Sequence, residues 1–182
     1  MIPLGYLAKR IPTERPSWLN APNVVDVCSV SDCVNDTLVF YDLPDCPHNG
    51  FGVYNSPALI ASTAKQNKID LAGSRLFFYE AYEAELDGDE WVPLMPDGTS
   101  DTEIVLPAAK ELVGFDVVTL IDGPNSHSPL SCNSIAREIP TNRHCLLDTL
   151  DEALTALASG AFEGAEDGPY RVYAVYSVAW PE

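Results

Sequence analysis

The last stretch of the chain, residues 170–180 (YRVYAVYSVAW), limits most strongly what this sequence can fold into. It is rich in β-branched and aromatic side chains and contains neither glycine nor proline, which is typical of a long strand. Two hairpins are expected before it, the first joining 37–42 to 51–54 and the second joining 74–86 to 91–94. Strands joined by tight turns run antiparallel. The sequence therefore predicts a mainly antiparallel sheet, although the stretch EAYEAEL would by itself suit a helix.

Further strand-like runs and three helix-start signals complete the expected elements. Strands are expected at 23–30 and 114–121, where β-branched residues are frequent. A serine followed by proline favours a helix start, as does a Thr-x-x-Glu capping box, because these residues suit the free N–H groups of a first turn. Helices are therefore expected to begin at Ser56-Pro57, at Ser128-Pro129 and at the Thr149–Glu152 box.

These elements alternate irregularly and predict an α+β fold, a mainly antiparallel β-sheet with about three helices packed on it. Residues 1–23 predict an extended, proline-rich N-terminal arm, anchored by Trp18. Residues 24–182 are then expected to form a single α+β domain, which is long enough to bury a substantial core without disulfides or metal.

Composition and the first residues indicate the cellular compartment in which we expect this protein. Hydrophobic residues make up 46% of it, as in globular proteins, and no apolar run is long enough to cross a bilayer. The first residues, MIPLGYLAKRIPTERP, lack the charge order and cleavage site of a signal peptide. The odd number of cysteines, five, favours reduced thiols. We therefore expect a cytoplasmic protein with no cofactor.

Charge is the strongest global signal in the sequence. The net charge is −17, and nine acids but no basic residue lie between Arg75 and Lys110. Such a surface repels nucleic acid and anionic membranes and favours a cationic protein partner, although acidity can also serve solubility alone. If 76–86 is a strand, Glu83 and Glu85 share a face, which we expect to be solvated. The expected contact residues are Tyr82, Glu83, Glu85, Asp87, Asp89, Glu90 and Trp91.

Residues 127–147 raise the alternative of an enzyme, because they gather two histidines and two cysteines. In the first turn of a helix that begins after Ser128, Cys132 would benefit from free N–H groups and the helix dipole. His127 or His144 could then act as its base, with Asn133 orienting the histidine or holding an oxyanion. This pattern supports the hypothesis of a cysteine-dependent hydrolase or transferase.

The same stretch also fits a purely structural role. On a continuous helix, Cys132, Ile135, Ala136 and Ile139 would form one apolar stripe, which predicts that Cys132 faces the core. Cys145 likewise fits a buried strand position. We favour this interpretation, because burial makes a thiol less reactive.

A metal site is a further candidate, because each of the three histidines lies near a cysteine in the sequence. The weak candidate ligands are Cys46, His48 and His144, and Cys28-x4-Cys33 forms another weak pair. The spacings match no familiar zinc motif, and neighbours such as His144 and Cys145 would point to opposite faces of a strand.

Three classes of function follow, of which we rank binding first. The first is a small acidic binding protein that neutralises a basic partner, of the general type of immunity proteins or nucleic-acid-mimicking inhibitors. The second is the cysteine enzyme centred on Cys132. The third is an accessory protein without catalytic function. The sequence leaves the oligomeric state open.

Overall fold

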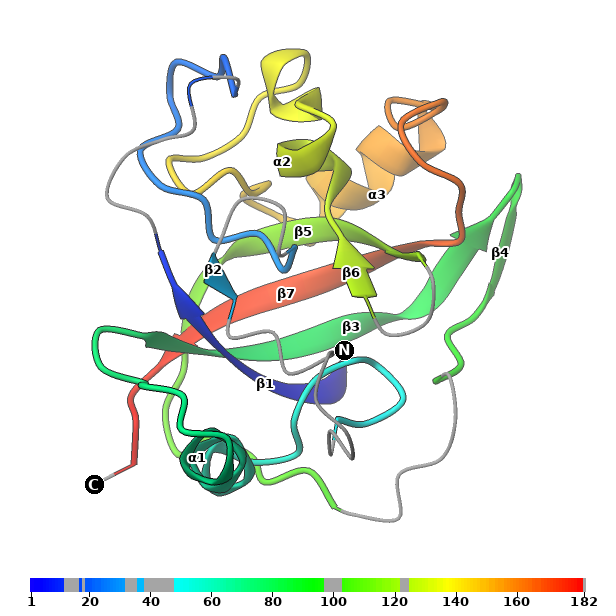
Figure 1. Ribbon diagram of the computed structural model, residues 1–182. Coiled ribbons are helices and arrows are strands. Elements are labelled where there is room, and N and C mark those ends of the chain that lie inside the picture. The colour runs from blue at the N-terminus through cyan, green and yellow to red at the C-terminus, as the bar shows by residue number, and fades with distance from the viewer. Residues whose placement is uncertain are drawn as a thin grey trace.

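The computed structural model describes residues 1–11, 17, 19–31, 36–37, 48–96, 103–121 and 125–181. Within these residues the strands form one antiparallel sheet in the order β2-β1-β3-β7-β5-β6, and β4 pairs with β3 (Figure 1). The strands are β1 (Ile2–Arg10), β2 (Asp36–Thr37), β3 (Arg75–Asp87), β4 (Glu90–Pro93), β5 (Glu111–Ile121), β6 (Asn125–His127) and β7 (Tyr170–Val178).

The longest strand, β3, organises the sheet. Along one edge its first half pairs with β1, from Arg75 to Ala81, and its last four residues pair with β4. Along the other edge it pairs with β7, with a register shift between Ala81 and Glu85. Register shifts of this kind increase the local twist, and two more of them, in β1 and β5, help to curl the sheet.

Glycine is required at the register shifts in β1 and β5. Gly5 has φ +135°, and a Cβ there would lie 2.4 Å from the carbonyl oxygen of Tyr54. Gly114 has φ +154°, and its Cβ would lie 2.7 Å from the Cβ of Leu146. Any other residue would therefore push away the neighbouring segment as well as strain the backbone.

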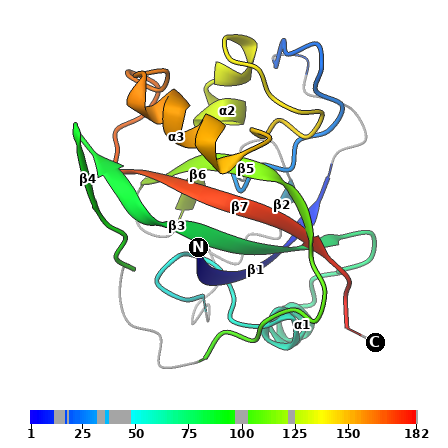
Figure 2. The ribbon, with the colours of Figure 1, turned by 180° about the vertical axis from the view of Figure 1, so that it is seen from behind.

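The helices lie on both sides of the sheet. Helix α1 (Pro57–Gln66) lies on one side, and α2 (Pro129–Cys132) and α3 (Leu150–Ala158) lie on the other (Figures 1 and 2). Two hydrophobic clusters correspond to the two sides. Ile60 of α1 is buried in the same cluster as Tyr173 of β7, whereas Leu157 of α3 is buried in the same cluster as Val172. Adjacent β7 residues thus serve opposite faces, as strand geometry requires.

Several sequence predictions are confirmed. The class is α+β, and residues 74–86 form a strand of the second hairpin rather than a helix. Helix α1 begins after Ser56, whose hydroxyl accepts a hydrogen bond from the Leu59 N–H at 3.2 Å. Helix α3 begins with the expected capping box between Thr149 and Glu152.

Other predictions are wrong. Residues 23–30 are not a strand, because N–H groups of this segment bond to a loop: those of Val25 and Cys28 donate to the carbonyls of Arg143 and His144. In the expected hairpin of 37–42 with 51–54, 51–53 are turn and bend, Tyr54 makes one isolated bridge to Tyr6, and 38–42 lie outside the described residues. The expected Trp18 anchor also lies outside them.

The helix expected after Ser128 has only one turn. The Ser128 hydroxyl does not cap it but donates to Asp116, and Ser134 adopts a left-handed φ of 61°. A short 3₁₀ turn, η1 (Ile135–Arg137), follows. The predicted apolar stripe from Cys132 to Ile139 therefore does not lie on one continuous helix.

Part of the expected N-terminal arm belongs to the sheet. Residues 2–10 form β1, between β2 and β3. Leu4, Tyr6 and Leu7 are buried there, and so is Lys9. This segment therefore contributes directly to the hydrophobic core.

Candidate functional site

The tip of the β3–β4 hairpin is exposed and negatively charged. Gly88 and Asp89 form the turn, with Gly88 at φ 59°, and Asp87 pairs with Glu90 across it. The hairpin reaches beyond the rest of the sheet (Figures 1 and 2). The carboxylates of Asp87, Asp89 and Glu90 are exposed, and none forms an ion pair with a basic residue in the described part of the chain.

The other expected contact residues differ in their exposure. Glu83 is exposed, but Glu85 is only 8% exposed, and its carboxylate accepts a hydrogen bond from Arg171 Nε at 2.5 Å. The expectation of a solvated face is therefore wrong for Glu85, because its cross-strand partner in β7, Arg171, is itself buried and binds its carboxylate. Tyr82 is half-buried and packs edge-on against Trp91, with 5.9 Å between ring centroids. Trp91 itself is 41% exposed.

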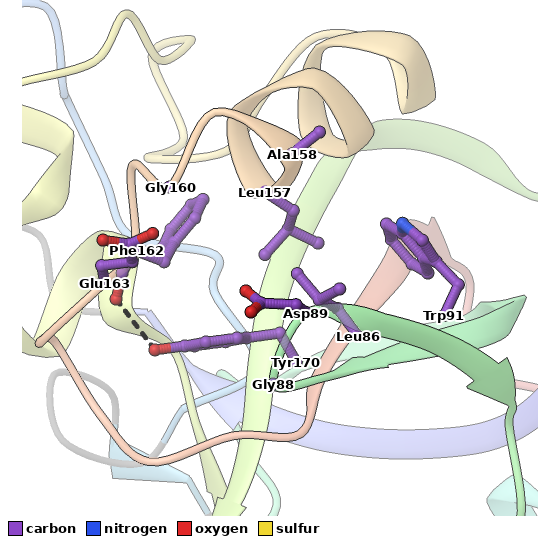
Figure 3. A pocket seen from close by; sticks show the side chains of 10 residues that line it. All are labelled: Leu86, Gly88, Asp89, Trp91, Leu157, Ala158, Gly160, Phe162, Glu163 and Tyr170. Carbon is purple, nitrogen blue, oxygen red and sulfur yellow. Dashed lines mark hydrogen bonds between the residues drawn. The ribbon is translucent and has the colours of Figure 1, made fainter.

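A hollow of about 270 Å³ lies between the hairpin tip and the end of α3 (Figure 3). Asp89 and Trp91 line it from the hairpin, and Phe162 and Glu163 line it from the turn after α3. The ring of Tyr170 lines it as well, and its hydroxyl donates to the carbonyls of Phe162, at 2.8 Å, and Glu166, at 2.5 Å. The hollow thus combines two carboxylates with aromatic rings, a set of groups that attracts a cation.

The cysteine and histidine stretch is not assembled into one catalytic group. The sulfur of Cys132 lies 2.7 Å from the Ser31 hydroxyl. His127 lies 3.4 Å from a Glu166 carboxylate oxygen, and Asn133 donates to that same oxygen at 2.8 Å. His144 lies elsewhere, beside Asp26. The hypothesis of an enzyme centred on Cys132 gains no support from these partners, because they are Ser31 for Cys132, Glu166 for both His127 and Asn133, and Asp26 for His144.

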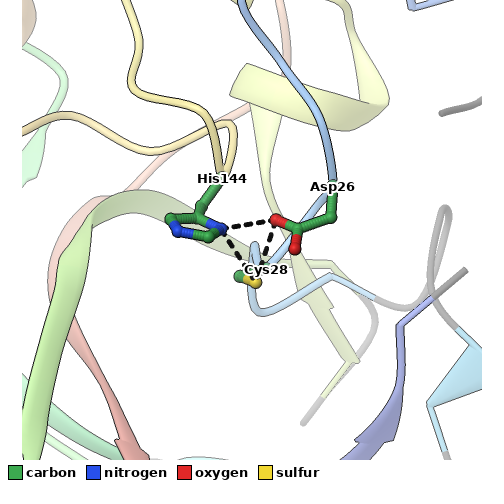
Figure 4. Close-up of side chains that lie close together, drawn as sticks. All are labelled: Asp26, Cys28 and His144. Atoms are coloured by element: carbon green, nitrogen blue, oxygen red, sulfur yellow. Dashed lines mark hydrogen bonds and ion pairs between the residues drawn. The ribbon is translucent and has the colours of Figure 1, made fainter. Parts of the chain in front are cut away.

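His144 belongs instead to a cluster with Asp26 and Cys28 (Figure 4). Its Nδ1 lies 2.5 Å from Asp26 Oδ1 and 3.9 Å from Cys28 Sγ. Burial, followed by the neighbouring Asp26 charge, raises the pKa of the Cys28 thiol to about 12. Sulfur and carboxylate lie at the same ring nitrogen, so the imidazole cannot relay a proton between them as it does in a catalytic triad.

Sequence reasoning found only part of this cluster. It named His144 as a weak metal candidate and Cys28 as half of a weak pair with Cys33. Cys33 and Cys46 lie outside the described residues, and His48 Nδ1 lies 3.1 Å from the backbone carbonyl of Asn49. The missed signal is the Asp26-x-Cys28 spacing, which places both side chains on one side of an extended segment.

A third polar group lies entirely in the interior. Asp116 is fully buried and accepts hydrogen bonds from the Val30 N–H, at 2.7 Å, and the Ser128 hydroxyl, at 2.6 Å. Burial raises the pKa of the Asp116 carboxyl to about 6, against the lowering effect of these bonds and of Lys9. Lys9 is also buried and donates to the carbonyls of Ser29 and Ser31. Cys145 is buried, as expected, but it lies in a bend with φ 61° and not in the expected strand, and burial raises its pKa to about 12.

No family model, curated protein or solved structure matches this chain. Among the described residues, no helix has the length and apolar character that a bilayer crossing needs. The function therefore has to be argued from the groups described above.

Proposed function

We propose that this chain is an acidic, cytoplasmic protein that binds a cationic protein partner through the tip of the β3–β4 hairpin. The sheet, with the helices packed on it, would serve as the rigid support of this tip. The observation that carries the proposal is the exposed charge of Asp87, Asp89 and Glu90 at the projecting tip of the hairpin, where no basic residue of the described part of the chain pairs with them. Three like charges on one turn cannot neutralise one another, so they project a local negative field.

One basic side chain of the partner would bind in the hollow beside the tip. A lysine or arginine there would meet the carboxylates of Asp89 and Glu163 and the rings of Trp91 and Tyr170. Aromatic anchors surrounded by charge are the arrangement that interfaces use for affinity and for fast association. Neutralisation of a basic toxin, as immunity proteins or nucleic-acid mimics do, is the class of activity that this surface fits.

Replacing the tip acids tests this proposal. The variant Asp87→Asn, Asp89→Asn, Glu90→Gln removes three charges at the tip, and the control Glu103→Gln, Glu111→Gln, Glu138→Gln removes three from exposed positions outside the hairpin. Each protein serves as bait in a lysate of the native host, with bound proteins quantified by mass spectrometry. We expect the wild type and the control to retain the same basic protein and the tip variant to lose it.

Kinetics on the recovered protein then sharpen the result. The tip variant should associate more slowly and with a weaker salt dependence, while dissociation changes less. Equal recovery by all three baits, or equal association rates at low salt, would show that the acidity of the tip serves solubility alone.

A further inference from the structure

We propose that Asp26, Cys28 and His144 form a binding site for a transition-metal ion of the Zn²⁺ type. This inference is independent of the proposed partner binding, because the cluster lies at the opposite end of β3 from the hairpin tip, beside Arg75. The three side chains supply a thiol, an imidazole nitrogen and a carboxylate oxygen, the ligand types that zinc accepts. Sulfur and nitrogen ligands disfavour the harder ions Ca²⁺ and Mg²⁺.

The distances suit one ion. Cys28 Sγ lies 3.6 Å from Asp26 Oδ1 and 3.9 Å from His144 Nδ1. Zinc bonds of about 2.3 Å to sulfur and about 2.0 Å to nitrogen or oxygen place tetrahedral ligands roughly 3.3–3.6 Å apart. The two separations that involve sulfur are thus close to those of a loaded site. The third, 2.5 Å between His144 Nδ1 and Asp26 Oδ1, is that of a hydrogen bond and must open when an ion takes the place of the proton.

The backbone holds the ligands near one another without help from an ion. The Cys28 N–H donates to the carbonyl of His144 at 3.0 Å, and the Val25 N–H donates to that of Arg143 at 2.8 Å. The side chain of Asn142 shapes the histidine loop, because its Oδ1 accepts the His144 N–H at 2.9 Å. Two segments more than a hundred residues apart are therefore already in register, which reduces the ordering that metal binding requires.

Surrounding groups orient the Asp26 carboxylate and leave the cluster accessible to a metal ion from solvent. Arg75 Nη1 lies 3.7 Å from Asp26 Oδ2, so the ion pair uses one oxygen and leaves Oδ1 facing the sulfur and the imidazole. Partners of this kind orient metal ligands in known sites. The side chains of Asp26 and His144 are 22% and 25% exposed, whereas Cys28 is buried. An ion can therefore enter from the carboxylate–imidazole side, where a water would complete its coordination.

Charge sets an upper limit on the affinity. A thiolate and a carboxylate neutralise a divalent ion, and Arg75 then adds one positive charge next to it. Three protein ligands with a neighbouring cation should therefore bind more weakly than a closed four-ligand zinc site.

Cobalt titration of the reduced, full-length protein tests the site. We expect one equivalent of Co²⁺ to produce thiolate-to-cobalt charge-transfer absorption, and one equivalent of Zn²⁺ to abolish it. Cys28→Ser should remove this absorption, and His144→Ala should weaken binding by about tenfold or more. The matched controls are Cys132→Ser and His127→Ala, which change the same residue types outside the cluster and should bind Co²⁺ like the wild type. Circular dichroism of each variant checks that it folds.

X-ray absorption of the zinc-loaded wild type decides the matter even where a variant fails to fold. One sulfur at about 2.3 Å together with nitrogen or oxygen ligands at about 2.0 Å would support the site. A zinc shell without sulfur, an absence of charge-transfer absorption in the wild type, or its persistence in folded Cys28→Ser would overturn the proposal.

Discussion

The two ends of strand β3 carry opposite charges and use them differently. At the start, Arg75 pairs with Asp26 and lies over the Phe77 ring, 5.1 Å from its centroid. At the end, Asp87 adjoins two further acids, and no described basic residue pairs with any of them. At the first end, the charge of Arg75 forms an ion pair with a segment distant in the sequence. At the second end, the charges are exposed to solvent and available to a partner.

The middle of β3 shows why the acidic stretch is not one uniform surface. Glu80 pairs with Lys110 at 2.5 Å, and Glu85 pairs with Arg171 at 2.5 Å in the interior. Only Glu83 and Asp87 of the four acids in β3 are exposed. Within β3, the acids that are exposed therefore lie toward the tip, and the contrast between the two ends can be tested by substituting the charged residues of each end separately.

The largest effect is expected from Glu85→Gln. This change leaves Arg171 buried beside a neutral amide, and removing one partner of a buried ion pair costs about 3–5 kcal/mol. Urea unfolding at pH 7 measures the loss, with Glu83→Gln as the control on an exposed acid of the same strand. We expect the control to stay within about 0.5 kcal/mol of the wild type. A loss below about 1 kcal/mol for Glu85→Gln would mean that water screens the pair.

Asp116→Asn should produce the next largest effect, and it should depend on pH. The folded pKa of about 6 lies above the ordinary value of 3.8, so the native state holds the Asp116 proton more tightly than the unfolded chain does. The stability that this proton brings is fully present below pH 3.8 and is lost as the pH rises through 6. The asparagine has no such proton, and Ser128 can accept a hydrogen bond from its amide by turning its hydroxyl.

The measurement compares unfolding free energies of the wild type and Asp116→Asn from pH 4 to pH 7. Because a separation of about two pH units corresponds to roughly 3 kcal/mol, the wild type should lose up to about that amount relative to the variant. Parallel pH profiles would show that the carboxyl stays ionised in the core throughout this range.

The sequence predicted elements whose signals are local. The starts of α1 and α3 depend on residues within one turn, and the β3–β4 hairpin depends on the Gly88 turn. The Ser128-Pro129 signal resembles the one at Ser56-Pro57, yet the Ser128 hydroxyl bonds to Asp116 of β5 instead of capping α2. A buried carboxylate on another element competes for the hydroxyl, and no local pattern contains that information.

The candidate sites show the same limit. The acids of the tip could be named from the sequence, because a charged turn is exposed whatever surrounds it. The Asp26–His144 contact could not, since it joins residues 118 positions apart. Strand β1 was also not predicted as a strand, because Pro3 and Gly5 disfavour one. The register shift that accommodates these two residues depends on the pairing of β1 with β3.

The smallest predicted effect on stability compares the two ends of β3 directly. Arg75→Gln removes a partly exposed ion pair, and we expect it to cost about 0.5 kcal/mol. The tip variant Asp87→Asn, Asp89→Asn, Glu90→Gln removes like charges that repel one another, and we expect no loss or a gain of up to about 0.5 kcal/mol. Urea unfolding is compared at low salt and in 0.5 M NaCl, an experimental condition in which the screening length is about 4 Å. Salt should reduce the stability change of both variants, because both changes are electrostatic. A clear loss of stability in the tip variant would contradict the contrast, since it would mean that the tip acids hold the fold together, as Asp26 does at the other end.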